Sequence, residues 1–190
     1  MQELYDHINK YTVIDKNEFQ EISSFFETES INKKEVIYEA GHKSLNHYFV
    51  LEGCVHMYFI NERGIEQTIQ FAIKNWWITD YLAFQNKRSS EFYIQAVEPS
   101  VILQTGCEKQ EKLLQQFPKM ETYFRNIYQT AYGAAIMRMK YIFSYSKEEI
   151  YFHFKDAFPD FVNNVPQYLV ATYLGLSPEY VSKIKRKSIS

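Results

Sequence analysis

Several side chains that can bind an anion or read a base gather near the C-terminus of the chain. Four cations lie between positions 183 and 187, and no acidic residue stands among them. On a helix they would share one exposed face with the polar residues just before them, and such a face suits the major groove of double-stranded DNA. The candidate DNA-contacting residues are Ser177, Pro178, Glu179, Ser182, Lys183, Lys185, Arg186 and Lys187.

The segment that must position these side chains, residues 167–187, has the pattern of two helices joined by a tight turn. Gly175 follows an apolar stripe at helical spacing and can take the positive φ on which many helices end. Ser177 can cap a second helix, on which Val181 and Ile184 fall three apart and face inwards. The pattern predicts a DNA-binding helix-turn-helix, and an ordinary helical hairpin with a solvated basic end is the alternative.

Composition limits the class of protein. The chain has 190 residues, of which 46% are hydrophobic and 17% aromatic, so it is globular and large enough for one or two cores. The formal net charge of −2 means that nucleic-acid binding must rest on local charge. No apolar run is long enough for a membrane span and no signal peptide is seen, so we expect a cytoplasmic protein with no membrane partner. Cys54 and Cys107 are expected to be reduced packing residues.

The elements before the C-terminal segment change type along the chain. Residues 1 to about 28 carry apolar side chains at three- and four-residue steps and predict short helices. Residues 36–104 contain short alternating strands separated by turns, and these predict a small antiparallel β-roll of jelly-roll type. The expected fold class is therefore α+β, with residues 1–117 as a sensor domain.

A long helix is predicted over residues 118–144, opened by Pro118. Its length exceeds what a small roll can bury, so a second copy of the same helix is the expected partner, and packing along its own domain is the alternative. Residues 145–190 then form the DNA-binding domain, whose first helix begins at a capping box. The apolar positions of the long helix nearest a three-four rhythm are Phe124, Ile127, Ala131, Ala134 and Tyr141, with Arg138 interrupting them.

Taken in this order, the elements resemble the Crp/Fnr family of bacterial transcription regulators over nearly the whole chain. The stretch "FVLEGCVHMYFI" looks like the opening hairpin of a cyclic-nucleotide-binding domain, and "VPQYLVATYLGLSPEYVSKIKRK" looks like the DNA-binding helices of Bacteroidetes-type members. The resemblance implies a homodimer joined through the long helices, an effector pocket between roll and helix, and two recognition helices on a palindromic site. RNA polymerase is a further partner that such a regulator could contact.

The resemblance also assigns roles on the recognition helix. Ser177, Pro178, Glu179 and Lys183 match the positions that face DNA in the family. Glu179 could accept a hydrogen bond from a cytosine amino group, and Lys183 could donate to guanine. Pro178 stands where well-known members carry a base-reading arginine, so the target sequence should differ.

The effector pocket departs from the family pattern. Aligned on "YIQA", Ser90 and Glu91 stand where cyclic-nucleotide binders carry the arginine and hydroxyl that hold the phosphate, and no Gly-Glu pair precedes them. We therefore expect that cyclic AMP is not bound and that any effector is a different small molecule. The candidate pocket residues are Trp76, Trp77, Thr79, Asp80, Arg88, Ser90 and Glu91, with core packing as the alternative for the tryptophan pair.

Nothing in the sequence indicates catalysis. His42, His47 and His56 do not form a metal-ligand motif, and no nucleophile triad, phosphate-binding glycine loop or paired carboxylates is found. We expect no enzyme activity, no metal and no cofactor. The alternative function is a sensory or scaffold module that binds a small molecule or a protein without reading DNA.

Overall fold

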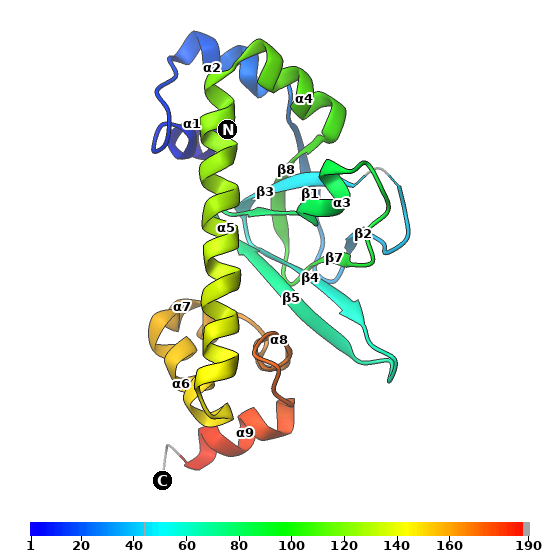
Figure 1. Ribbon diagram of the computed structural model, residues 1–190, viewed down its shortest axis with the longest axis vertical. Helices are drawn as coiled ribbons and strands as arrows, with labels where there is room; N and C mark the ends of the chain where they lie inside the picture. The colour runs from blue at the N-terminus through cyan, green and yellow to red at the C-terminus, as the bar shows by residue number, and fades with distance from the viewer. Residues whose placement is uncertain (44, 188–190) are drawn as a thin grey trace. The chain divides into compact units, whose positions relative to one another are not determined.

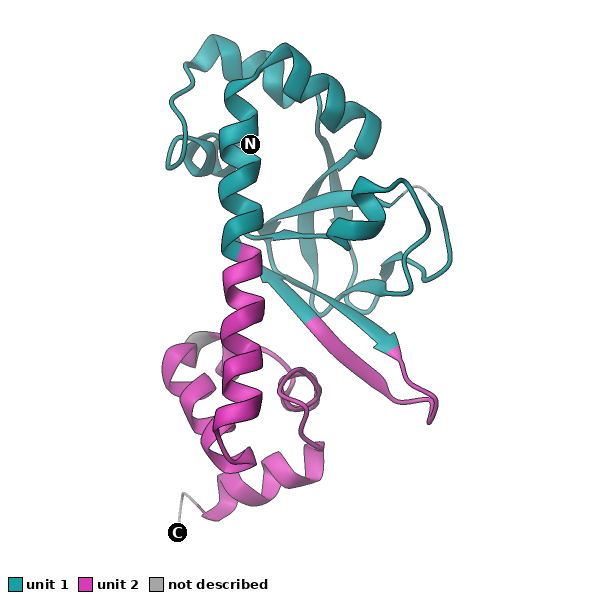
Figure 2. Cartoon of the chain, in the orientation of Figure 1, with its two compact units in different colours: residues 1–59, 70–130 teal, residues 60–69, 131–190 magenta. Residues whose placement is uncertain are grey.

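The computed structural model describes residues 1–43 and 45–187, together with all side chains in these ranges except those of residues 160 and 164. The chain divides into two compact units (Figure 2). The first unit contains residues 1–59 and 70–130, and the second contains residues 60–69 and 131–190. The helical and strand elements are labelled in chain order (Figure 1).

The first unit is built on two four-stranded sheets with the strand orders β1-β8-β3-β6 and β2-β7-β4-β5. The strands of the first sheet are β1 (Glu27–Ile31), β8 (Ser100–Gly106), β3 (Asn46–Glu52) and β6 (Trp77–Ile78). Those of the second are β2 (Val36–Tyr38), β7 (Tyr93–Ala96), β4 (Cys54–Ile60) and β5 (Glu66–Ile73), whose outer end lies in the second unit. The described pairings are antiparallel, which confirms the predicted α+β roll.

Four helices accompany these sheets, and a fifth begins in the same unit. They are α1 (Gln2–Ile8), α2 (Lys16–Ser23), α3 (Tyr81–Gln85), α4 (Cys107–Gln116) and the first part of α5 (Lys119–Ser144). The core of the unit is rich in aromatic rings, and three polar groups within it satisfy one another. Trp77 donates from Nε1 to the hydroxyl of Tyr123 at 2.7 Å, and that hydroxyl lies 2.8 Å from Nδ1 of His7. These hydrogen bonds give the polar atoms of Trp77, Tyr123 and His7 partners within the core.

The β3–β4 turn depends on a glycine. Gly53 has a φ of +84°, and a Cβ added there would lie 2.4 Å from the Ser100 Oγ and 2.6 Å from the Pro99 carbonyl oxygen. We expect Gly53→Ala to lower the free energy of unfolding by about 3 kcal/mol or more, because backbone strain and a clash act together. Gly64→Ala is the control, since Gly64 has a φ of +74° with nothing within 4 Å of its Cβ, and should cost only about 1–2 kcal/mol. Urea unfolding compares the two; equal losses would contradict the predicted clash.

Helix α5 covers the predicted long-helix segment and changes character along its length. Its first part buries apolar side chains in the first unit, whereas its second part exposes a row of them. The row consists of Tyr132, Ile136, Met139 and Phe143, which we call the α5 stripe. The spacing of four, three and four residues places the stripe on one helix face. Ala134, which was expected on the apolar face, lies on the side of α5 opposite the α5 stripe. It shares that side with Ala131, Arg138 and Tyr141.

The second unit is helical apart from the tip of the β4–β5 hairpin. It contains the end of α5 and α6 (Lys147–Ala157), α7 (Pro159–Asn164), α8 (Gln167–Tyr173) and α9 (Pro178–Lys187). Pro159 starts α7, because its fixed φ suits a first helical position. In the part of the chain that the structure describes, no helix is both long and apolar enough to cross a bilayer.

Candidate nucleic-acid interface and ligand cavity

The turn between α8 and α9 follows from local backbone chemistry. Gly175 has a φ of +69°. Its N–H donates to the Thr172 carbonyl at 3.1 Å, and the Leu176 N–H donates to the Ala171 carbonyl at 2.9 Å. These two bonds form a Schellman motif, which satisfies carbonyls that the end of α8 would leave unpaired. The Ser177 hydroxyl then accepts from the Tyr180 N–H at 3.2 Å, as the predicted cap requires.

Helix α9 turns one face inwards and one outwards. Val181 and Ile184 are buried, so the helix is held against the rest of its unit by apolar packing. On the other side, the candidate residues Ser177, Glu179, Lys183, Arg186 and Lys187 are exposed, while Pro178, Ser182 and Lys185 are half-buried. Glu179 lies in the first turn and three cations lie in the last turn, an arrangement that also stabilises the helix dipole. Lys183, in the middle of the helix, has no such role.

Ser182 has a structural partner that the sequence did not indicate. The Gln167 amide donates from Nε2 to the Ser182 Oγ at 2.8 Å, and this bond joins the start of α8 to the middle of α9. Ser182 therefore helps to fix the position of α9 relative to α8.

Arg138 joins several elements of the second unit. Its guanidinium donates to the carbonyl oxygens of Ile69, at 2.9 Å, and of Tyr173, and its Cζ lies 4.3 Å from the centre of the Tyr173 ring. Burial lowers the pKa of Arg138, while Tyr173 opposes this shift. Because Tyr173 ends α8, one side chain connects α5, the outer end of β5 and α8. From the sequence alone, Arg138 appeared only as an interruption of an apolar pattern.

In the loop that corresponds to the phosphate-binding loop of cyclic-nucleotide binders, polar groups hydrogen-bond to one another. Asp80 caps α3 by accepting from the N–H groups of Leu82 and Ala83 at 3.2 and 3.1 Å. Its other carboxylate oxygen accepts from the Ser90 hydroxyl at 2.8 Å. Ser90 is only 3% exposed, and its N–H donates to the Tyr38 hydroxyl at 3.1 Å. A carboxylate thus occupies the neighbourhood of Ser90, and it would repel a phosphate.

The seven candidate pocket residues do not surround a common space. Trp77 lies in the core, and Thr79 is fully buried, donating to the Asn46 carbonyl at 2.9 Å. Trp76 and Glu91 are exposed, and Asp80 and Ser90 bind each other. Of the seven, Arg88 lines the cavity described next. The spread arises because consecutive residues on a strand or a tight turn point in different directions.

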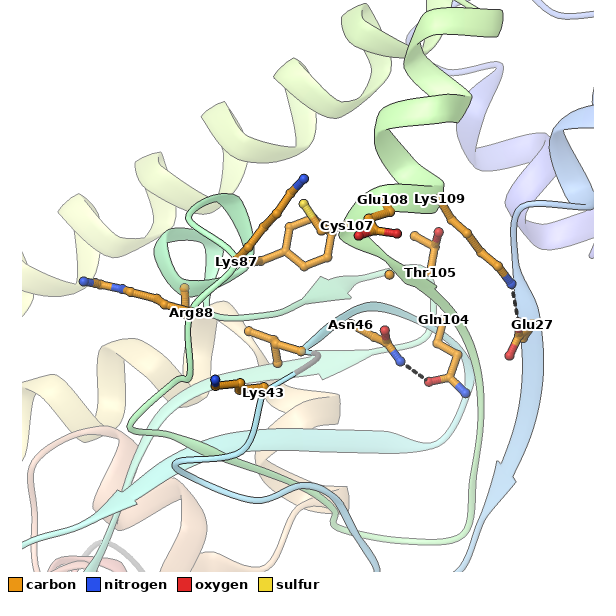
Figure 3. Close-up of a pocket in the computed structure, with 14 residues that line it drawn as sticks. Glu27, Lys43, Asn46, Lys87, Arg88, Gln104, Thr105, Cys107, Glu108 and Lys109 are labelled. Carbon is orange, nitrogen blue, oxygen red and sulfur yellow. Dashed lines mark hydrogen bonds and ion pairs between the residues drawn. The ribbon is translucent and has the colours of Figure 1, made fainter.

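That cavity has a volume of about 510 Å³ and lies in the first unit (Figure 3). Its walls come from the start of β3, from α3 and the loop after it, from the end of β8 and from the first turn of α4. None of the described lining residues belongs to α5. The lining residues with charged side chains are Glu27, Lys43, Lys87, Arg88, Glu108 and Lys109. Sequence reasoning found only Arg88 among them, because most of the others lie far from Arg88 in the chain.

No metal site accompanies these features. Across residues 1–43 and 45–187, no three His, Cys, Asp or Glu side chains gather where they could hold a metal ion. His47 and His56 are buried, and each pairs with a glutamine through one ring nitrogen, at 3.0 Å to Gln110 and 3.2 Å to Gln95. Cys54 and Cys107 are free thiols.

One family model matches part of the first unit. Residues 28–117 match the model of the cyclic nucleotide-binding domain. The match is to a binding domain and not to a catalytic one, which agrees with the expectation that the chain is not an enzyme. No curated protein matches the sequence.

Solved structures resemble the chain over both units. FixK2 from Bradyrhizobium japonicum is 16% identical with a TM-score of 0.71, and the match covers 85% of this chain and 83% of that one. The catabolite activator protein of Thermus thermophilus is 16% identical with a TM-score of 0.58, covering 92% and 83%. The c-di-GMP responsive global regulator CLP from Xanthomonas campestris is 10% identical with a TM-score of 0.70, covering 91% of each chain. The fold is thus that of Crp/Fnr structures.

Proposed function

We propose that this protein is a homodimeric, DNA-binding transcription regulator of the Crp/Fnr type. The observation that carries the proposal is helix α9, which is seated by Val181 and Ile184 and presents Glu179 and Lys183 to solvent. A short helix that packs against its unit on one face and exposes cations on the other fits a major groove. The proposed domain limits are 1–117 for the sensor, 118–144 for the dimer helix and 145–190 for the DNA-binding domain.

Dimerisation completes this proposal. The α5 stripe is an apolar row that a second copy of the helix would cover, and two copies would carry two recognition helices. Half-sites about one DNA turn apart, near 34 Å, would match a twofold symmetric dimer. RNA polymerase stays a proposed partner with no residue assigned to it.

Selection of bound DNA from a random pool tests the function. The proposal expects enrichment of a palindrome, because each recognition helix reads the same half-site. A pool that stays random would support the alternative, a sensory or scaffold module that does not read DNA. A single non-repeated motif would contradict the dimer.

Cyclic AMP is expected not to bind. The Asp80–Ser90 pair leaves a carboxylate where the phosphate would need a cation, and Glu91 adds a second carboxylate on the exposed side. Calorimetric titration of the full chain with cyclic AMP should show no binding heat. Saturable binding in the micromolar range would contradict this reading of the loop.

A further inference from the structure

The cavity lined by Arg88 has features that point to a specific kind of ligand. Its volume of about 510 Å³ falls in the range of small-molecule sites. Leu45, Ala83 and Phe84 give it an apolar wall, and Asn46 and Gln104 place amide groups beside that wall. Those two amides hydrogen-bond to each other at 2.7 Å across the strands (Figure 3).

The first turn of α4 opens onto this cavity. Cys107, Glu108 and Lys109 begin the helix and line the space, and the preceding residue, Gly106, has no side chain to cap them. The first N–H groups of a helix have no partners within the helix, and they carry the positive end of its dipole. An oxygen-rich anion is the ligand that such a helix end binds.

A buried hydroxyl at the same place lacks a partner. Thr105, the residue just before Gly106, is 2% exposed and lines the cavity. Its Oγ1 makes no hydrogen bond within the part of the chain that the structure describes. Figure 3 shows its side chain beside the start of α4. Leaving such a group unpaired is unfavourable, whereas a ligand oxygen at the helix end could accept a hydrogen bond from this hydroxyl.

The charges around the cavity favour an anionic ligand. Four cations and two carboxylates belong to the lining, and the Glu111 carboxylate, which pairs with Lys87, reduces the local excess to one positive charge. Lys109 pairs with Glu27 and Lys87 pairs with Glu111 at 2.9 Å. For Lys43 and Arg88, no ion pair is found among the described residues. Both lie on the side of the cavity opposite Lys109 (Figure 3).

We propose that this cavity binds a small phosphorylated polyol, with its phosphate against the first turn of α4. The phosphate would accept hydrogen bonds from the Thr105 hydroxyl and the uncapped N–H groups, while Arg88 and Lys43 would attract the anion from across the cavity. Hydroxyl groups of the ligand would then form hydrogen bonds with Asn46, Gln104 and the Glu108 carboxylate. This binding needs neither DNA nor dimerisation, so it stands apart from the proposed function.

Titration of the ¹⁵N-labelled full chain with ribose 5-phosphate tests the proposal by NMR. The amide signals of Cys107, Glu108 and Lys109 are expected to shift in a saturable way, because these N–H groups would donate to the phosphate. Neutral ribose should cause no such shift. Citrate is the carboxylate comparison, and a response to citrate that equals or exceeds the response to ribose 5-phosphate would overturn the assignment to phosphate.

Variants link the response to the cavity. Thr105→Val keeps the shape of the side chain and should weaken binding about tenfold, the factor expected for one hydrogen bond to a charged group. Because the lost hydroxyl has no hydrogen-bond partner among the described residues, the unfolding temperature should stay the same or rise. Arg88→Gln should weaken binding as well.

The control is Lys119→Gln, which removes an exposed cation that pairs with Glu18 and does not line the cavity. Its affinity for ribose 5-phosphate should equal that of the wild type. The proposal fails if the helix amides do not respond to ribose 5-phosphate, or if Thr105→Val and Arg88→Gln bind as tightly as the control.

Discussion

Replacing both Ile136 and Phe143 with aspartate is expected to leave the protein monomeric and to weaken binding to a palindromic DNA site by more than about 100-fold. The two side chains belong to the α5 stripe and are 44% and 82% exposed in the single chain. Covering them with the same stripe of a second copy would remove apolar surface from water, and two buried carboxylates would prevent this. A monomer loses the avidity that two linked recognition helices provide.

Ala134→Asp is the matched control for this change. Ala134 is exposed on the opposite face of α5, so its replacement adds a charge to the same helix without touching the stripe. Sedimentation velocity should show a dimer for the wild type and for Ala134→Asp, and a monomer for the double variant. A double variant that remains dimeric would place the dimer contact elsewhere, and a monomeric Ala134→Asp variant would favour the face expected from sequence.

The free energy of unfolding is expected to fall steeply as the pH drops from 6.5 to 4. Burial lowers the pKa of His7, His47 and His56 to about 4, from an ordinary value of 6.5. In this interval the unfolded chain binds protons that the folded chain does not, so acidification favours unfolding. Each buried histidine can contribute about 1.4 kcal/mol per pH unit, or roughly 3 kcal/mol over the whole interval.

Two histidine variants isolate the contribution of His47 to the pH dependence of the free energy of unfolding. His47→Asn retains a donor toward Gln110, which His47 contacts through Nδ1 at 3.0 Å, and removes the titrating ring. His42→Asn removes an exposed histidine whose only ion pair in the described ranges is with Glu39. Denaturant unfolding at a series of pH values should show a shallower pH dependence for His47→Asn and an unchanged one for His42→Asn. Equal slopes for both variants would contradict the assigned cause.

Local signals made the C-terminal motif predictable. A positive-φ glycine, a serine cap and two buried apolar residues act within a few residues of one another, so Gly175, Ser177, Val181 and Ile184 could be assigned from sequence. The β-roll was predictable for a similar reason, because turn residues separate its strands at short intervals. These features need no knowledge of distant contacts.

The ligand-binding features could not be predicted in the same way. The Thr105 hydroxyl lacks a hydrogen-bond partner because of the residues that the fold packs around it. The cavity likewise brings together residues from position 27 to position 109. Arg138 reaches a carbonyl 69 residues away at Ile69 and another 35 residues away at Tyr173. For Trp77 the sequence left a place in the pocket and core packing both open, because its partner Tyr123 lies 46 residues further along the chain. Such contacts follow from the assembled fold and not from spacing.

Fluorescence anisotropy with the selected palindrome shows whether α9 reads DNA. We expect Lys183→Ala to weaken specific binding by at least about tenfold in the dimer, since each copy loses a base contact worth about 1–3 kcal/mol. Lys147→Ala, which removes an exposed cation from α6, should bind as the wild type does. Unchanged affinity and base preference in Lys183→Ala, or an equal loss in Lys147→Ala, would contradict a recognition role for α9.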